Sequence, residues 1–232
     1  DTPTNNWATL NPLHWNTLKG SGGTANGADF TQANLRFVSP SNVTSPYQRS
    51  TGSTIEVSSG KWYYEVTVEA TDNGVSVGFA ESDALDSDGY WTGMWSYNYY
   101  DQTKKVAGSG SDYGGQASGG DIVGVAFDLD NDTMEFFLNN SSQGKVTSLG
   151  ISGKTVVAAF VIAFWTNRIV VNFGQQGFAY TPPAGFKALC TKNLPSNDPA
   201  IIRPQRHFDT VLWSGNNTAG RLIPLEFKPD FV

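Results

Sequence analysis

The sequence predicts an all-β fold, with two antiparallel sheets packed as a β-sandwich. Aromatic residues, which favour strands, make up 13% of the 232 residues, while 25 glycines and 11 prolines divide the chain into short runs. Several of these runs alternate apolar and polar side chains, which is the pattern of a strand with one buried face. No stretch keeps a helical period of apolar residues, so packed sheets are the expected architecture.

Charge and cysteine content exclude several kinds of partner and site. The net charge is −6, and the basic residues gather only at Lys104-Lys105 and at Arg203 and Arg206, so we expect no nucleic-acid partner. No apolar run is long enough to span a bilayer, so we expect no membrane insertion. Cys190 is the single cysteine, which excludes an intrachain disulfide and a cysteine metal cluster.

The first part of the chain predicts little regular structure. Residues 1–20 contain two prolines and many Asn and Thr residues, so we expect an extended lead-in or linker. Trp7, Leu10 and Leu13 are its candidate anchors on a neighbouring surface. The sandwich itself is expected to span residues 21–195, and its first short strand should end before Pro40.

Residues 60–79 predict a β-hairpin. Apolar residues at positions 62, 64, 66 and 68 alternate with polar residues at 65, 67 and 69, so one face should be buried and the other solvated. Residues 72–74 have the composition of a turn, and the alternating run 75–79 is the expected partner strand.

The central element is a second hairpin over residues 120–140. Two apolar strands flank the polar turn Asp130-Asn131-Asp132, whose side chains favour tight turns by bonding to nearby backbone. The predicted core residues of the two hairpins are Trp62, Tyr64, Val66, Val125, Phe127 and Phe136.

Two further strands and a tail follow. The run 154–165 is apolar throughout, which predicts a strand covered on both faces, and 168–173 predicts another strand. Residues 196–206 are expected to be a linker. Residues 207–232 predict a short C-terminal β-hairpin extension that begins a following module.

Two groups of carboxylates are candidate calcium ligands. Asp128, Asp130 and Asp132 have the alternate spacing of a calcium loop, but Thr133 and Asn139 replace the glycine and glutamate that such a loop requires, so we expect a hydrogen-bonded turn. The second group lies in a loop, where solvated surface is the simpler interpretation. Its members are Asp83, Asp86 and Asp88. We therefore expect no metal and no other cofactor.

An enzyme is the least favoured function. His207, Asp209 and Ser214 are the residue types of a catalytic triad, but residues so close along one strand cannot converge as a triad does. The glycine-rich stretch 108–111 has no following lysine and no helix, so it does not predict a phosphate site.

The segment 81–119 is the candidate binding site. It is predicted to be a long loop between two predicted strands, and such loops are usually functional. Exposed rings beside polar groups would suit a sugar or a protein surface, whereas rings that pack on the sandwich edge would be structural. The candidate ligand-binding residues are Trp91, Trp95, Tyr97, Asn98, Tyr99, Tyr100 and Asp101.

Five motifs in this order resemble the SPRY domain. They are Gly-Lys-Trp-Tyr-Tyr-Glu-Val at 60–66, Val-Gly-Phe-Ala at 77–80, Gly-Asp-Ile-Val-Gly-Val-Ala-Phe-Asp-Leu-Asp at 120–130, Phe-Phe-Leu-Asn-Asn at 136–140 and Asn-Phe-Gly at 172–174. The family usually has Asn-Gly where this chain has Asn139-Asn140. The resemblance covers roughly residues 30–194 and implies a bent, concanavalin-like antiparallel β-sandwich whose loops bind a partner without catalysis.

Both flanks resemble those of SPRY modules in bacteriophage tail and fibre proteins. The similar segments are 1–13, 207–217 and 227–232. In such proteins the chain continues, so the sequence is expected to be a fragment. The resemblance implies a structural or adhesive virion module, located outside the cell, that contacts a host-surface glycan or protein and other virion subunits, with a homotrimer as the arrangement common in fibres. The alternatives are a secreted bacterial carbohydrate-binding module attached to an enzyme, and a cellular SPRY adaptor that binds a peptide.

Overall fold

The computed structural model describes residues 5–17, 29–39, 48–71, 75–86, 93–163, 167–195 and 214–215. Contacts divide the chain into residues 1–194 and residues 195–232, and almost all described residues belong to the first unit. The linker and hairpin expected over 196–232 lie outside the described residues, apart from Ser214 and Gly215. Within the described part, no helix has the length and apolar character needed to cross a membrane.

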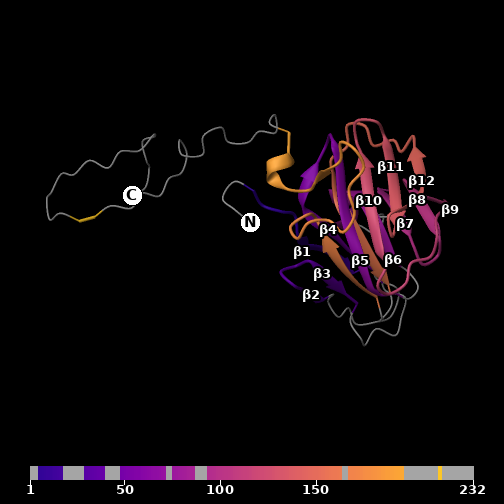
Figure 1. Ribbon diagram of the computed structural model, residues 1–232, viewed down its shortest axis with the longest axis horizontal. Coiled ribbons are helices and arrows are strands. Elements are labelled where there is room, and N and C mark those ends of the chain that lie inside the picture. Colours follow the sequence, from indigo (N-terminus) through magenta and orange to yellow (C-terminus); the bar gives the residue numbers. More distant parts are fainter. Residues whose placement is uncertain are drawn as a thin grey trace. The chain divides into compact units, whose positions relative to one another are not determined.

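Two sheets form the first unit, which confirms the predicted all-β sandwich (Figure 1). The strands of the seven-stranded sheet are, in spatial order, β1 (Leu10–Thr17), β4 (Gln48–Val57), β13 (Val156–Ala163), β6 (Val75–Glu81), β7 (Met94–Asn98), β8 (Thr103–Val106) and β9 (Ser109–Asp112). Those of the eight-stranded sheet are β12 (Ser141–Thr147), β11 (Thr133–Leu138), β10 (Ile122–Asp128), β5 (Lys61–Ala70), β14 (Arg168–Asn172), β3 (Arg36–Val38) and β2 (Asp29–Thr31), while β15 (Lys187–Ala188) pairs with β5 in parallel. The helical turns described are η1 (Ser82–Asp86) and η2 (Thr191–Asn193).

The β-hairpin predicted over residues 60–79 is wrong, although both of its strands form. β5 pairs with β10 and β14 in the eight-stranded sheet, whereas β6 pairs with β13 and β7 in the seven-stranded sheet. The two strands therefore face each other across the core, because their alternating apolar residues specify a buried face and not a pairing partner.

Aromatic rings from both sheets fill the space between them. Phe127 of β10 stacks on Phe79 of β6 with ring centroids 3.4 Å apart, and Tyr64 of β5 meets Phe160 of β13 edge-on at 5.4 Å. The Tyr64 hydroxyl donates a hydrogen bond of 2.7 Å to the Gly78 carbonyl, so this buried phenol is satisfied across the sheets. All six predicted core residues are buried, and at most 2% of the surface of each residue is exposed to solvent.

The outer face of β5 is less solvated than its alternation predicts. Tyr63 and Glu65 are both buried at 2% exposure, because the chain after β14 folds back over them. The Glu65 carboxylate accepts hydrogen bonds from the backbone N–H groups of Ala179 and Tyr180, at 2.7 and 2.9 Å, and from the Tyr63 hydroxyl at 3.1 Å. Three hydrogen-bond donors compensate the buried carboxylate for its lost hydration. The prediction that this face of β5 is solvated is therefore wrong at Glu65.

The apolar run of β13 is covered on both faces, as predicted. Phe160 points into the main core, whereas Val157, Ala159 and Val161 form a second cluster on the opposite face. Leu85 of η1 belongs to that cluster, so the short helical turn helps to cover the outer face of the seven-stranded sheet.

The carboxylates of the central hairpin hold the turn and its neighbours. Asp128 pairs with the Lys61 ammonium at 2.9 Å. Asp130 accepts the Gly60 N–H at 2.8 Å, and Asp132 accepts the Ile151 N–H at 2.9 Å. Each carboxylate is therefore engaged with a different neighbour, which supports the hydrogen-bonded turn.

Asn139 and Asn140 form the two-residue connection between β11 and β12. Their φ angles are 48° and 66°, and Leu138 pairs with Ser141 across the turn. Both residues therefore adopt the left-handed conformation that a tight hairpin needs, which Asn tolerates better than most residues.

The N-terminal lead-in is part of the sandwich, because residues 10–17 form the edge strand β1. Trp7 forms an isolated bridge with Cys190, and Leu10 is fully buried, so two of the expected anchors do contact the domain. Leu13 is 93% exposed, and its expected anchoring role is wrong. Pro12 and a bulge in the pairing interrupt this strand, which explains why its sequence shows no strand period.

We expect Phe127→Ala to lower the free energy of unfolding by about 3–5 kcal/mol, because it removes a ring from the contact between the sheets. Chemical denaturation monitored by fluorescence would measure the loss. Phe137→Ala is the matched control: Phe137 is only partly buried on the outer face of β11 and should cost clearly less. Equal losses would mean that the ring of Phe127 is not a principal part of the core.

We expect Asp128→Asn to destabilise the domain by about 1–3 kcal/mol at neutral pH, and by progressively less as the pH falls. Burial raises the pKa of Asp128, but hydrogen bonds from Asn131 and Lys61 outweigh it, so this pKa lies below its ordinary value. A depressed carboxyl pKa gives stability that is present above the unfolded-state pKa and lost as the pH falls through the folded-state pKa.

The measurement is urea denaturation of both proteins between about pH 7 and pH 2, across the titration range of aspartate. Asp112→Asn, at an exposed carboxylate of β9, should leave stability close to that of the parent protein throughout. A pH-independent difference for Asp128→Asn would show that its ionisation is not coupled to folding.

Candidate functional site

The segment expected to be a long loop over 81–119 mainly forms secondary structure. It contains η1 and the strands β7, β8 and β9, which extend the seven-stranded sheet beyond β6. The sequence shows no alternation over β7 because residues 94–97 are buried on both faces of the sheet. The sequence of β9 predicts a loop because it consists of Ser, Gly and Asp residues, all of which are exposed.

Three of the proposed ligand-binding rings are interior. Trp95, Tyr97 and Tyr99 are at most 1% exposed, so the expectation that they form a surface platform is wrong for this structure. The Trp95 indole N–H donates to the Leu149 carbonyl at 2.8 Å, and the Tyr97 hydroxyl donates to the Gly115 carbonyl. Alternation along β7 directs both of these rings into the core, so they support the strands that carry the surface.

The polar end of the segment remains accessible. The Asn98 side chain accepts the Tyr100 and Asp101 N–H groups, at 3.1 and 3.0 Å, and donates to the Asp101 carboxylate at 2.7 Å. These bonds fix a tight turn in which Asp101 is exposed and Tyr100 half-buried. Trp91 and Asp88 lie outside the described residues.

The carboxylates proposed as weak calcium ligands are not brought together by the described structure. Asp83 is exposed on η1, and the side chain of Asp86 lies outside what the structure describes. Among the described residues, no group of three or more His, Cys, Asp and Glu side chains is arranged to hold a metal ion.

The accessible turn belongs to a surface that joins three segments distant in sequence: 98–102, 112–116 and 141–144. We call it the three-segment surface. The Tyr113 N–H donates to the Gln102 carbonyl at 2.7 Å, and the Gly115 N–H donates to the Gln143 side chain at 2.7 Å. The Tyr113 hydroxyl donates to the Gly144 carbonyl. Backbone and side-chain bonds thus hold the edge of one sheet against the edge of the other.

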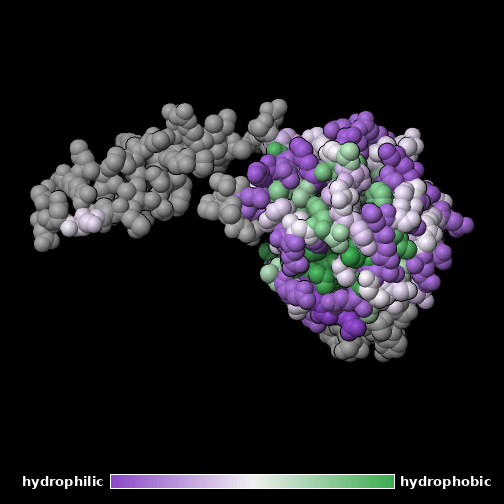
Figure 2. All heavy atoms as spheres, in the orientation of Figure 1, coloured by the Kyte–Doolittle hydropathy of each residue, from purple (hydrophilic) through white to green (hydrophobic). Residues whose placement is uncertain are grey.

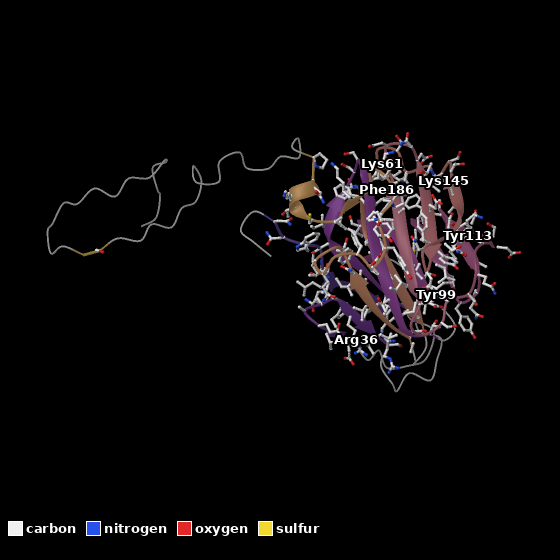
Figure 3. The ribbon with its side chains drawn as sticks, viewed as in Figure 1. Arg36, Lys61, Tyr99, Tyr113, Lys145 and Phe186 are labelled. Atoms are coloured by element: carbon white, nitrogen blue, oxygen red, sulfur yellow. The ribbon has the colours of Figure 1, made fainter. Side chains whose placement is uncertain are left out.

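The exposed groups of the three-segment surface are mainly hydrogen-bonding groups. They comprise the carboxylates of Asp101 and Asp112, the amides of Gln102 and Gln116, and the hydroxyls of Ser141 and Ser142. The half-buried Tyr113 supplies an aromatic ring among them, with the Lys104 ammonium 5.0 Å from its centroid. Figure 3 shows Tyr113 at this side of the sandwich, with Tyr99 lower along the same side.

Burial makes the hydroxyls of Tyr97 and Tyr113 harder to ionise than an ordinary phenol, which is itself protonated at neutral pH. It raises the pKa of Tyr97 and of Tyr113 to about 12, so both hydroxyls remain donors to the carbonyls that they contact. Tyr97, Tyr113 and Phe136 pack together with centroids 5.4 to 5.9 Å apart. These ring contacts lie beneath the backbone of the three-segment surface and support it.

Sequence reasoning missed the segment 141–144, and it named no residue of 112–116 although that segment lies within the candidate site 81–119. Residues 112–116 and 141–144 show no concentration of aromatic or charged residues and come from separate sheets. Both segments contain Gly and Gln, but only the fold brings them together.

We expect Trp95→Ala to lower the free energy of unfolding by about 3–5 kcal/mol, because it empties a large interior site and leaves the Leu149 carbonyl without its donor. Tyr100→Ala, in the same segment, should cost about 1 kcal/mol or less, since Tyr100 is half-buried. Thermal and urea denaturation would measure both. An unchanged melting temperature for Trp95→Ala would mean that the Trp95 ring is not a packing residue and could be exposed for ligand binding.

Comparison with known proteins places this architecture in a family. The model of the SPRY domain matches residues 61–176, which is half of the chain. The SPRY domain of human HERC1 superimposes with a TM-score of 0.55 at 10% identity, covering 70% of this chain and 96% of that one. Stonustoxin superimposes with a TM-score of 0.52 at 17% identity, covering 71% of this chain but 27% of the toxin chain. SPRY domains are typically protein-interaction modules, and this chain belongs to the SPRY domain family.

Proposed function

We propose that this SPRY domain is a non-catalytic adhesive module of a phage tail or fibre protein, and that it contacts a host-surface glycan or protein through the three-segment surface. The observation that carries the proposal is the composition and fixed geometry of that surface. Carboxylates, amides and hydroxyls lie exposed around half-buried tyrosines on strand ends and short turns. Rigid frames that present such residues are the usual basis of recognition.

The same composition favours non-covalent recognition. Exposed Asp and Gln side chains would accept and donate hydrogen bonds to hydroxyl or amide groups of a ligand, while the rings of Tyr100 and Tyr113 would contact its apolar parts. Because the Asn98 side chain fixes the turn through three hydrogen bonds, little conformational entropy would be lost on binding. The buried rings below would contribute by holding the backbone in place.

The virion context of the proposal is supported by the flanking segments. Residues 1–13 and 207–217 resemble those beside SPRY modules of phage tail and fibre proteins. In that setting the module would face outwards on the virion, with other virion subunits as further partners. Detection of the parent protein by mass spectrometry of purified virions would test this part of the proposal independently of ligand binding.

We expect the double variant Tyr100→Ala and Asp101→Ala to lose attachment to host cells or arrayed glycans while its melting temperature stays close to that of the parent. These two side chains are accessible, unlike the neighbouring rings. Fluorescently labelled protein would be measured on a bacterial strain panel and on a glycan array. Glu56→Ala removes an exposed carboxylate of β4, in a strand outside the surface, and is the control. Undiminished attachment by the double variant would place the binding surface elsewhere.

A further inference from the structure

A groove lies on the outer face of the eight-stranded sheet, and none of the residues that line it belongs to the three-segment surface. Its volume is about 310 Å³, at the lower end of the range for small-ligand sites. The lining residues are Tyr63, Glu135, Phe137, Asn140, Thr181 and Pro183. They come from β5, from β11 and its turn, and from the chain after β14, so the groove exists only in the folded domain.

The floor of the groove depends on a glycine. Tyr63 of β5 extends over Gly124 of β10, where an added Cβ atom would lie 2.6 Å from the Tyr63 hydroxyl oxygen. The missing side chain lets the tyrosine lie across the neighbouring strand. Phe178 then packs edge-on against Tyr63, with centroids 4.9 Å apart, and holds the ring in place.

One wall of the groove is fixed at both of its ends. Glu65 accepts the Ala179 and Tyr180 N–H groups on one side of this wall. On the other side, Phe186 lies near the Lys61 ammonium, 6.0 Å from its ring centroid, and the two are adjacent in Figure 3. Residues 181–183 lie between these two contacts.

The opposite wall combines a negative charge with an aromatic ring. Glu135 and Phe137 are two residues apart on β11, so both project from the same outer face. The Ser142 hydroxyl donates to one oxygen of the Glu135 carboxylate at 2.6 Å, which orients the group and leaves acceptor capacity free. Glu135 is the single charged residue among those that line the groove, so the groove is complementary to a cation.

We propose that this groove binds an arginine side chain presented by a protein partner. A guanidinium is planar, so it can stack on the Phe137 ring while its N–H groups donate to the Glu135 carboxylate two residues away. The Asn140 amide and Thr181 hydroxyl at the rim then accept hydrogen bonds from the partner. Figure 2 shows apolar and polar residues interspersed over the visible face of the domain, a pattern that suits a contact combining stacking with hydrogen bonds.

Lys145 would compete with the arginine for the Glu135 carboxylate under this proposal. It is the register partner of Glu135 on β12 and is exposed, but it does not line the groove. A positive charge on the neighbouring strand weakens the attraction between the Glu135 carboxylate and a second cation. Removing the charge of Lys145 should therefore strengthen arginine binding, whereas removing the charge of Glu135 should weaken it.

The test is a titration of the ¹⁵N-labelled chain with the peptide acetyl-Gly-Arg-Gly-amide, followed by NMR. We expect saturable shifts of the backbone amides of Glu135, Phe137 and Thr181. The same peptide with citrulline in place of arginine, which is neutral and of similar shape, should bind about tenfold more weakly because it lacks the charge. Glu135→Gln should remove this preference, Lys145→Gln should increase affinity, and Glu56→Gln should change neither.

Several outcomes would overturn the proposal. One is that the arginine and citrulline peptides bind equally, and another is that the shifts are confined to residues outside the groove. A third such outcome is that the groove binds glucosamine, a cationic sugar, but does not bind the peptide. Should Glu135→Gln fail to fold, the Lys145→Gln variant and the citrulline peptide still decide the question. Tyr100 and Asp101 do not line the groove, so the outcome here is distinguishable from that of the adhesive function.

Discussion

The contact between Phe79 and Phe127 is the interaction on which the rest of the domain depends. These rings stack face to face between the sheets, with an interplanar angle of 10°. Each ring belongs to a strand that is paired on both sides. Phe79 is in β6, which lies between β13 and β7, and Phe127 is in β10, which lies between β5 and β11. Displacing either ring would therefore disturb three strands of its sheet. Tyr64 adds a polar constraint, because its buried hydroxyl must remain next to the Gly78 carbonyl of the opposite sheet.

Strand alternation transmits this constraint to the outer surfaces. Once Phe127 and Trp62 face inwards, Gly124 and Tyr63 must face outwards, and their register places the tyrosine ring across the glycine. The buried Glu65 follows from the same alternation. Its carboxylate is then available to bind the backbone of residues 179–180. A residue pattern typical of a solvated face therefore occurs on a face that the chain covers.

The core residues and the hairpin of β10 and β11 were predictable from sequence, because periodicity determines which face of a strand is buried. The hairpin predicted over 60–79 was wrong, since periodicity does not determine which strands pair. Phe127 and Phe136 could be assigned to the interior from their neighbours alone. The covered strand β13 could be recognised from its unbroken apolar run in the same way. These predictions depend only on local sequence, and local sequence was sufficient for them.

The candidate site could not be predicted from sequence in the same way. Trp95 and Tyr97 lie on a strand with two buried faces, so their segment has no alternation to distinguish an interior ring from an exposed one. The neighbours of the accessible turn, residues 112–116 and 141–144, come from different sheets. Their meeting depends on how the sheets pack, and that information is distributed over the entire core rather than over any one motif.

The hairpin of β11 and β12 connects the two surfaces that the fold presents. On its inner face Phe136 packs against Tyr97 and Tyr113, which support the three-segment surface. On its outer face Glu135 and Phe137 line the groove. Because adjacent residues of one strand serve opposite faces, a shift of register by one residue would exchange these roles and destroy both surfaces. The tight turn at Asn139-Asn140 opposes such a shift, so its left-handed conformations help to maintain the geometry of both surfaces.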